Sequence, residues 1–239
     1  MVGYSSDKKN IPVKVVNTIY SRYVKRGFDI CLSGLALMVL SPVFLILIIL
    51  ELLFHGRPVL YKTMRPGKNG KIFKLYKFRS MTNARDSRGV LLPEKERLTS
   101  FGRFIRKTSL DELPELINIF KGDMSIIGPR PLLVEYMDYY STRHAQRHAV
   151  RPGLACFRII KTDSTTWTWR DQFENDIWYV EHISFLTDIK MVYAVLREVL
   201  KASDIRAEDE RLPFTGDNLD EIRCKSEVEE YHRYDSISR

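Results

Sequence analysis

The sequence lacks the features of several common protein classes. Its three cysteines lie far apart without C-x-x-C spacing, which argues against a disulfide framework and a structural zinc site. The five histidines have no metal-ligand spacing. Internal repeats and low-complexity segments are absent, and 28% charged with 11% aromatic residues exclude a disordered or collagenous chain. The 239 residues therefore suit one domain, or one domain with appendages.

Long apolar runs are scarce, because only one is present. A mean hydropathy of −0.23 excludes a multi-pass transporter. The single run has 21 uncharged residues between Asp29 and Glu51. As one helix it would extend about 31 Å, enough to cross a membrane, so a single transmembrane anchor is one interpretation. A signal peptide is not favoured, because the run is too long and no small-residue cleavage site follows it.

Positive charge is concentrated directly after this run. The whole chain has a net charge of +8, but residues 55–107 alone hold fifteen Lys/Arg against three Asp/Glu, a net charge of +12. Residues 108–239 carry a net charge of −7. The basic block predicts anionic partners, and by charge alone these include nucleic acid, phospholipid head groups and phosphorylated substrates.

Two features of the apolar run favour a re-entrant hairpin over a spanning helix. Ser41-Pro42 lies at its midpoint, where proline removes a helical hydrogen bond and kinks the helix. Basic residues flank both ends, and the positive-inside bias places both flanks on the cytoplasmic side. A helix-break-helix that enters and leaves the same leaflet meets both conditions, if groups such as the Ser41 hydroxyl satisfy the freed backbone.

The remaining pattern predicts a mostly helical α+β chain with a small β-hairpin. Two β-like runs flank an Asn-Gly turn signal, and a basic amphipathic helix follows that could lie in a membrane interface or pack on the core. Two further helices are indicated by apolar residues at spacings of three and four. The expected elements are the strands Val59–Thr63 and Ile72–Phe78, a polar loop at 83–96, and helices at Leu98–Lys107, Leu132–Ala149 and Glu181–Lys201.

The segment that follows the basic block carries the pattern that points to chemistry. Pro114 is suited to begin a helix and Gly122 to end it. Asp111 and Glu112 then lie at a helix N-terminus, where the dipole stabilises ionised carboxylates. Ser109-x-x-Glu112 is also a capping-box pattern, so simple helix capping is an alternative. An ionised carboxylate near basic residues can instead attack phosphorus, with Arg, Lys or Mg²⁺ neutralising the phosphates.

A second candidate is an arginine held between two prolines, in Gly128-Pro129-Arg130-Pro131. The prolines restrict the backbone that presents the guanidinium, and the arginine fork suits phosphate oxygens. The same tripeptide also occurs as a plain turn.

These motifs occur in a defined order. They are Lys25-Arg26-x-x-Asp29, Ser41-Pro42, Arg65-Pro66-Gly67, Lys77-Phe78-Arg79-Ser80-Met81, Ser109-x-Asp111-Glu112-Leu113-Pro114-Glu115-Leu116, Lys121-Gly122-Asp123-Met124-Ser125-Ile126-Ile127-Gly128-Pro129-Arg130-Pro131, Arg151-Pro152-Gly153 and Phe173-x-x-Asp176-x-x-Tyr179-Val180-x-x-x-Ser184-Phe185-x-x-Asp188. The ordered set closely resembles the bacterial sugar transferase family, the monotopic polyprenyl-phosphate phosphoglycosyltransferases that begin surface glycan assembly. The resemblance covers roughly residues 21 to 214.

The resemblance implies a monotopic protein at the cytoplasmic face of the bacterial inner membrane. Its expected features are a re-entrant helix broken at Ser41-Pro42, interfacial amphipathic helices and contact with membrane lipids. The expected parts are a polar N-terminal extension, a membrane hairpin, a cytoplasmic catalytic domain and a charged tail, at residues 1–20, 21–56, 57–202 and 203–239.

The resemblance also implies the reaction. A sugar-1-phosphate passes from a UDP-sugar to polyprenyl (undecaprenyl) phosphate, with Asp111 as the nucleophile and UMP as the leaving group. Glu112 and Mg²⁺ orient and neutralise the phosphates, and Asp111 and Glu112 are the candidate metal ligands. The minimal form of the chain favours an N-acetylated amino sugar or a deoxyamino sugar.

Further site residues follow from matching positions. The resemblance assigns substrate binding to basic residues near the reaction, to a uridine-linked Pro-Arg-Pro and to one acidic residue. They are Lys77, Arg79, Arg106, Pro129, Arg130, Pro131 and Asp188. Downstream glycosyltransferases are possible partners, nucleic acid is not expected, and the oligomeric state is left open.

One stretch departs from the family pattern. Arg151-Pro152-Gly153 continues with Leu154-Ala155-Cys156, where family members carry Thr-Gly and later Gly-Arg-Asn. We hypothesise that residues 158–169 set an unusual donor preference. Two other functions stay open at this point: an inactive family member that acts as a membrane-bound scaffold, and a membrane-anchored basic protein that binds nucleic acid or anionic lipid.

Overall fold

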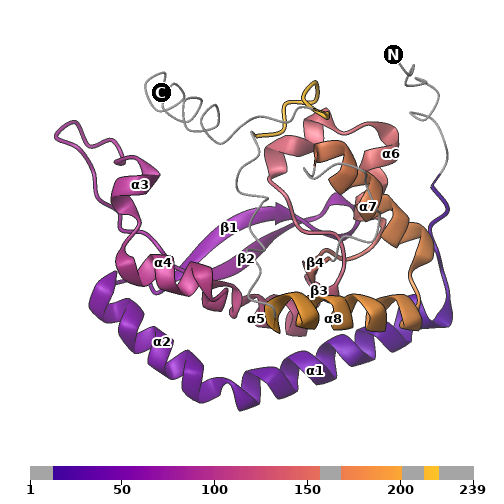
Figure 1. The fold of residues 1–239 in the computed structure, drawn as a ribbon, viewed down its shortest axis with the longest axis horizontal. Coiled ribbons are helices and arrows are strands. Elements are labelled where there is room, and N and C mark those ends of the chain that lie inside the picture. The colour runs from indigo at the N-terminus through magenta and orange to yellow at the C-terminus, as the bar shows by residue number, and fades with distance from the viewer. Residues whose placement is uncertain (1–12, 157–167, 201–212, 221–239) are drawn as a thin grey trace. The chain divides into compact units, whose positions relative to one another are not determined.

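The computed structural model describes residues 13–156, 168–200 and 213–220 (Figure 1). The chain forms two compact units. The first unit consists of Met1–Gly27, Arg65–Ile72 and Ser125–Arg239, and the second consists of Phe28–Met64 and Phe73–Met124. The described residues are mostly helical, with two small two-stranded sheets, as the predicted α+β class requires.

The apolar run folds as two helices with a break between them (Figure 1). These are α1, Lys25–Val39, which begins at the end of the first unit, and α2, Ser41–Phe54. Pro42 has no N–H to offer to the carbonyl of Met38, and the Ser41 hydroxyl donates to that carbonyl at 2.8 Å. The predicted break and the predicted partner at the break are both confirmed.

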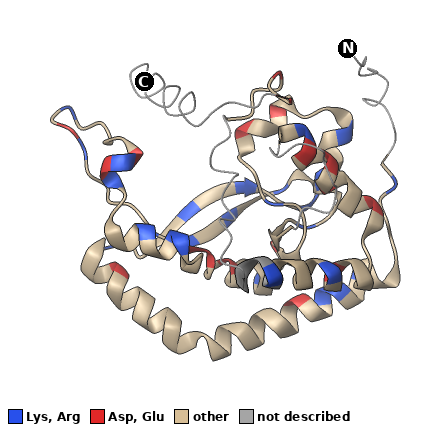
Figure 2. Cartoon of the chain, viewed as in Figure 1, with Lys and Arg blue, Asp and Glu red and all other residues tan. Residues whose placement is uncertain are grey.

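No single helix in the described ranges is long and apolar enough to cross a membrane by itself. The segments Tyr20–Val39 and Ser41–Phe54 reach the required length and composition only together, and they are bent by 62°. Between Asp29 and Glu51 the two helices carry no charged side chain (Figure 2).

The α2 helix has an inner face and an outer face. On the inner face Leu47 packs with Phe78 and Ile105 in the core of the second unit, and all three are nearly fully buried. The outer surface of both helices is apolar and exposed, at Phe28, Ile30, Leu32, Leu35, Met38, Val39, Leu45, Ile46, Ile48, Ile49, Leu52, Leu53 and Phe54. An apolar surface of this extent is unusual for a protein surrounded by water.

The predicted hairpin is confirmed. Its strands are β1, Leu60–Pro66, and β2, Ile72–Phe78, which pair in one sheet (Figure 1). A 3₁₀ turn at Lys68–Gly70 joins them, and Asn69 and Gly70 have φ angles of 57° and 72°. Asn and Gly tolerate this left-handed conformation, which is why the Asn-Gly signal located the turn.

The rest of the second unit consists of short helices. They are α3, Glu94–Arg97, α4, Ser100–Lys107, a 3₁₀ turn at Leu110–Glu112, and α5, Glu115–Lys121. The α4 helix begins at Thr99, whose side chain accepts the amide hydrogen of Gly102 at 2.8 Å. A Cβ atom at Gly102 would collide with the backbone of Ser80, so glycine allows α4 to lie against the end of the hairpin.

The first unit combines a small parallel sheet with helices. Its regular elements are a π-helical turn at Tyr20–Val24, the strands β3, Ser125–Ile127, and β4, Gly153–Ala155, the helices α6, Thr142–Ala145, α7, Trp169–His182, and α8, Phe185–Leu200, and 3₁₀ segments at Val134–Tyr139 and Gln146–Ala149. In the β3–β4 pair Ser125 lies opposite Gly153 and Ile127 opposite Ala155. This sheet was not among the elements expected from the sequence.

The predicted helix at Leu132–Ala149 is wrong. Tyr140 has an extended backbone, and the Ser141 side chain accepts the amide hydrogen of His144 at 3.1 Å, which begins a new helix. The segment is therefore two 3₁₀ pieces around α6, because local capping competes with a continuous helix.

The predicted helix at Glu181–Lys201 is also only partly right. The structure has α7, which begins after a capping box formed by Thr168 and Asp171, and then α8. The apolar spacing continues across the break at Ile183, whose side chain is buried in the core, and for that reason it predicted one helix through this point.

Among its described residues, the first unit has two hydrophobic core clusters. One is aromatic and joins Tyr136, Trp169, Phe173 and Phe214. The other contains Ile127, Tyr179, Ile183 and Met191. These clusters fix α7 beside β3 and the 3₁₀ segment Val134–Tyr139. The Pro-Arg-Pro loop lies between β3 and that segment in the chain.

A buried histidine makes the stability of the protein depend on pH. Burial, and then the charge of Arg147, lower the pKa of His148 from 6.5 to about 4. Between pH 6.5 and 4, His148 therefore binds a proton in the unfolded chain and stays neutral in the folded chain. We expect the free energy of unfolding to fall by about 2 kcal/mol from pH 7 to pH 5 through this group.

Urea unfolding at several pH values measures this dependence. Other groups titrate in the same range, so the comparison is with His148→Asn, which should show a flatter pH slope. Equal slopes in the two proteins would contradict the assignment to His148.

Candidate active site

The Asp-Glu pair lies in a tight turn directly before α5. Asp111 and Glu112 occupy the 3₁₀ turn, Pro114 is the N-cap of α5, and Gly122 ends the helix with a φ of 98°. The predicted helix bounds, and the position of the two carboxylates before the helix N-terminus, are confirmed. Asp111 is 9% exposed, so little of it reaches solvent.

The capping-box alternative does not describe this turn. The side chain of Ser109 makes no capping hydrogen bond, and the residue has a φ of 56°, which is uncommon for a non-glycine residue. The Ser109 carbonyl instead accepts the amide hydrogen of Glu112 at 3.2 Å. The unusual backbone at Ser109 marks the turn as a constrained one, and such conformations cluster at functional sites.

Lys77 links the turn to the hairpin. From β2, its Nζ atom lies 2.7 Å from Oε1 of Glu112 and 3.2 Å from Oε1 of Glu115. The structure therefore brings the predicted Lys77 and Glu112 together. Glu115 was missed as a member of this group, although its position three residues after Glu112 places both on one side of the turn and helix. Glu115 is 4% exposed, so it is a buried carboxylate that Lys77 neutralises.

A buried asparagine holds α5 beside β2. Nδ2 of Asn118 donates to the carbonyl of Lys74 at 2.7 Å and to Asp123 at 3.1 Å, and its Oδ1 accepts from the amide of Tyr76 at 3.1 Å. Asn118 has no exposed surface. These bonds fix the register between helix and strand and so place Lys77 against the glutamates. This role of Asn118 was not predicted, because an isolated asparagine carries no spacing signal.

The two predicted arginines of the second unit make different contacts. Nε of Arg106 donates to the Ser80 hydroxyl at 2.8 Å, and its Nη1 donates to Glu94 at 3.0 Å. The α4 helix that carries Arg106 packs against the turn of Asp111. Arg79 is buried and donates to the carbonyls of His55, Pro58 and Met81. Arg79 thus organises the backbone around it, and its contact with substrate stays a prediction.

The Pro-Arg-Pro loop lies in the first unit, after β3. The carbonyl of Pro129 accepts the amide hydrogen of Gly153 at 2.9 Å. Pro129 is buried, Pro131 is partly buried, and Arg130 is exposed. A Cβ atom at Gly153 would collide with the backbone of Gly128, so the glycine of Arg-Pro-Gly allows the two strands to approach. The loop presents one cation from a fixed backbone.

Asp188 joins three parts of the first unit. Its carboxylate accepts hydrogen bonds from the hydroxyls of Tyr20 and Tyr179, at 2.6 and 2.7 Å, and pairs with Lys25 at 2.6 Å. Burial, followed by the charge of Asp188, raises the pKa of Tyr179 well above 10. These contacts give Asp188 a structural role at the start of α8, and its predicted role in substrate binding stays a prediction.

Comparison with known proteins identifies the family. The model of the bacterial sugar transferase family matches residues 20–202. The chain belongs to the bacterial sugar transferase family. This match confirms the resemblance found from the motifs and covers all the site residues described above.

Three relatives illustrate the range of this sugar transferase family. The uncharacterized sugar transferase EpsL of Bacillus subtilis is 43% identical over 198 residues, which are 81% of this chain and 98% of that protein. The undecaprenyl-phosphate galactose phosphotransferase of Salmonella typhimurium is 35% identical over 76% of this chain and 41% of its own length. A UDP-N-acetylgalactosamine-undecaprenyl-phosphate N-acetylgalactosaminephosphotransferase of Aeromonas hydrophila is 33% identical over 74% of this chain and 44% of its own length. This sugar transferase therefore spans less than half of the last two relatives.

The segment for which we hypothesised an unusual donor preference lies mostly outside the described residues. Of residues 158–169 the structure describes only Thr168 and Trp169, which begin α7. Trp169 packs in the aromatic core. The thiol of Cys156 donates a hydrogen bond to Oδ1 of Asp176 at 3.8 Å, and its sulfur accepts one from Nδ2 of Asn175 at 3.6 Å.

Proposed function

We propose that this sugar transferase moves a sugar-1-phosphate from a UDP-sugar to polyprenyl phosphate and releases UMP. The observation that carries the proposal is the turn of Asp111 and Glu112 before α5, with Lys77 held against Glu112. The names of the Salmonella and Aeromonas relatives, which specify transfer to undecaprenyl phosphate, support it. The donor we favour is an N-acetylated amino sugar or a deoxyamino sugar.

The reaction would proceed in two displacements at one phosphorus atom. A carboxylate oxygen of Asp111 attacks the β-phosphorus of the donor, the bond from that phosphorus to the bridging oxygen of the diphosphate breaks, and UMP leaves with that oxygen. A phosphate oxygen of polyprenyl phosphate then attacks the same phosphorus and displaces the Asp111 carboxylate. The product is a polyprenyl diphosphate sugar, and the enzyme returns to its starting state.

The cationic side chains would neutralise the negative charges of the Asp111 carboxylate, the donor diphosphate and the polyprenyl phosphate, which come together in this reaction. Lys77 can turn from Glu112 towards a phosphate oxygen, since its ammonium group is a flexible point charge. Arg106 pairs with Glu94, whose side chain is 63% exposed, and an exposed pair of this kind is weak enough for a phosphate to replace the glutamate. Arg130 would bind the uridine nucleotide from its proline-bounded loop.

Magnesium fits the chemistry of the Asp-Glu turn. Within the described residues no three His, Cys, Asp or Glu side chains are grouped so that they could hold a metal ion. Mg²⁺ is commonly held by one or two carboxylates together with substrate phosphates, so Asp111 and Glu112 suffice as its protein ligands. When bound, the ion would supply additional positive charge next to the phosphates.

The test is UMP release from a panel of UDP-sugars with undecaprenyl phosphate and Mg²⁺. We expect turnover with at least one amino sugar donor, and more slowly or not at all with UDP-glucose and UDP-galactose. Turnover restricted to UDP-glucose would contradict the donor class while keeping the reaction. No turnover across the panel would favour the alternative function, an inactive membrane-bound scaffold.

We further propose that the protein is monotopic, with α1 and α2 as a re-entrant hairpin at the cytoplasmic face of the inner membrane. The exposed apolar surface of the two helices, the bend at Ser41-Pro42 and the basic flanks support this position. The α8 helix also exposes apolar side chains, namely Phe185, Leu186, Ile189, Val192 and Tyr193. Such a helix can lie in the membrane interface.

A topology experiment tests the hairpin. Single cysteines are placed before Lys25 and after Phe54, and a membrane-impermeant maleimide is applied to spheroplasts and to lysed cells. Both positions should react only after lysis, because a hairpin keeps both ends on the cytoplasmic side. Labelling of one position in intact spheroplasts would establish a spanning helix instead. Cys31→Ser removes the exposed native thiol of the hairpin as background.

A further inference from the structure

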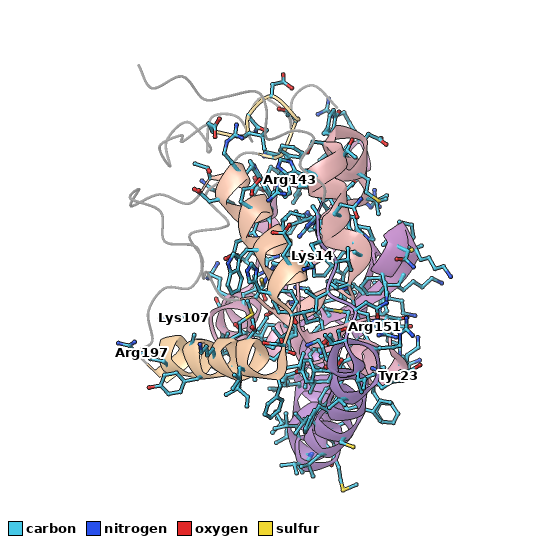
Figure 3. The ribbon with its side chains drawn as sticks, turned by 90° about the vertical axis from the view of Figure 1, so that its right-hand side faces the viewer. Lys14, Tyr23, Lys107, Arg143, Arg151 and Arg197 are labelled. Carbon is cyan, nitrogen blue, oxygen red and sulfur yellow. The ribbon has the colours of Figure 1, made fainter. Side chains whose placement is uncertain are left out.

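The side chain of Arg147 is buried beneath the Pro-Arg-Pro loop. It belongs to the 3₁₀ segment Gln146–Ala149, and only 2% of the residue is exposed. Two other arginines near it in the sequence are only partly buried: Arg143, which pairs with Glu174, and Arg151, which lies two residues before β4. In Figure 3, Arg143 and Arg151 lie well apart in the first unit. A fully buried arginine is uncommon and needs a partner for its charge.

Asp176 of α7 is that partner. Its Oδ2 atom lies 2.6 Å from Nη2 and 2.9 Å from Nε of Arg147, and Asp176 has no exposed surface. The other carboxylate oxygen accepts a hydrogen bond from Gln172 at 3.1 Å. The guanidinium also lies over the rings of Tyr140 and Phe173, with 5.9 and 5.8 Å from its central carbon to the ring centres. Charge and packing therefore fix the orientation of the guanidinium.

The guanidinium of Arg147 also donates hydrogen bonds to two groups other than Asp176. Nη1 donates to the hydroxyl of Tyr140 at 3.2 Å, and Nη2 donates to the carbonyl of Arg130 at 2.7 Å. Arg130 is the central residue of the loop, and its own side chain is exposed. The buried arginine thus holds the backbone of the exposed one.

The loop depends on bonds of this kind because of its composition. Pro129 and Pro131 have no N–H, so the loop can be anchored mainly through its carbonyl oxygens. The structure shows two such anchors in succession: the amide of Gly153 on the Pro129 carbonyl, and Arg147 on the Arg130 carbonyl. A lysine at position 147 could pair with Asp176 but could not direct several fixed donors to the acid, the hydroxyl and the carbonyl together.

We propose that Arg147 is a positioning residue for nucleotide binding: its guanidinium, fixed by Asp176, holds the Arg130 carbonyl and thereby directs the Arg130 side chain to the donor. This inference rests on the proposed function, in which Arg130 binds the uridine nucleotide. It adds a residue that does not touch the nucleotide and still sets the affinity for it.

The test is a double-mutant cycle on the affinity for UDP, measured by calorimetry on the full-length purified protein with Mg²⁺. UDP is the probe because every donor of the proposed class contains it. We expect Arg130→Ala to weaken UDP binding about tenfold and Arg147→Lys about fivefold. In the Arg130→Ala protein, adding Arg147→Lys should have less than a twofold further effect, since the two residues act as one unit.

Two additional variants separate positioning from general stability. Arg143→Met removes the analogous arginine–glutamate pair between α6 and α7 and should leave the UDP affinity within twofold. Tyr140→Phe removes only the hydroxyl on Nη1 and is expected to weaken UDP binding two- to threefold, and only where Arg130 is present. If Arg147→Lys does not fold, Tyr140→Phe, the milder variant, tests the positioning role of Arg147 in its place.

The other outcomes are distinct. If Arg130→Ala weakens binding and a folded Arg147→Lys does not, the positioning role is wrong while the proposed function stands. Additive effects of the two substitutions would also overturn the positioning role, because Arg147 would then act without Arg130. If Arg130→Ala leaves the UDP affinity unchanged, the proposed nucleotide role of Arg130 is wrong, and the role of Arg147 is wrong with it.

Discussion

Replacing Asp111 with asparagine is expected to reduce UMP release by about 1,000-fold or more. The amide keeps the size of the side chain but has no negative oxygen with which to attack phosphorus. The residue sits in a constrained turn before α5, so the substitution removes the proposed nucleophile and leaves the turn in place.

A mass measurement makes this expectation specific to covalent catalysis. In the absence of polyprenyl phosphate, the unmodified enzyme should gain the mass of one phosphosugar after incubation with its donor, and Asp111→Asn should gain nothing. Asp86→Asn is the matched control, since Asp86 lies on the surface loop before α3, and it should retain turnover. Persistent turnover in Asp111→Asn would exclude Asp111 as the nucleophile.

The second large effect is expected at Lys77. Lys77→Met removes the ammonium group that lies against Glu112 and the buried Glu115, and with it a positive charge from the proposed phosphate site. We expect the rate of UMP release to fall about 100-fold, because catalysis of this kind depends on charge neutralisation. Lys77→Arg should recover part of the rate, since it restores the charge with a different shape.

The controls for Lys77 use the same strand. Lys74 is an exposed lysine on β2, and Lys74→Met should keep the rate within about twofold. Thermal unfolding of Lys77→Met and Lys74→Met shows whether a lower rate reflects a loss of folded protein. A full rate in a folded Lys77→Met would mean that Lys77 only neutralises the glutamates.

The broken pair of apolar helices was the part of the fold most accessible from the sequence. The apolar run has a defined length, and Pro42 lacks the N–H that a continuous helix would need at its midpoint. The chemistry of a hydroxyl next to the break also predicted the bond from Ser41 to the Met38 carbonyl. Both features depend on residues within four positions of each other, so no knowledge of distant contacts was needed.

The helices of the first unit show where such reasoning fails. Apolar spacing predicted one helix at Leu132–Ala149, but the chain there is divided at Ser141, whose side chain begins a new helix. The α7 helix was missed because its buried side includes polar residues such as Gln172 and Asp176, and because the aromatic core on which it packs is completed by the distant Phe214. Propensity is a weak signal, and tertiary packing decides such segments.

By itself the sequence determined the family and the position of the Asp-Glu pair before a helix, and it predicts the reaction and the acid at its centre. Asp111, Glu112 and Arg130 stand in short motifs whose spacing and residue types suit this chemistry, and the family model spans all three positions. Only the tertiary structure decided what holds these residues. Lys77 contacts Glu112 because Asn118 ties α5 to β2, and the Arg130 backbone is held by the buried Arg147. Those contacts join residues 17 to 44 positions apart, and a separation of that kind leaves no periodicity in a single sequence.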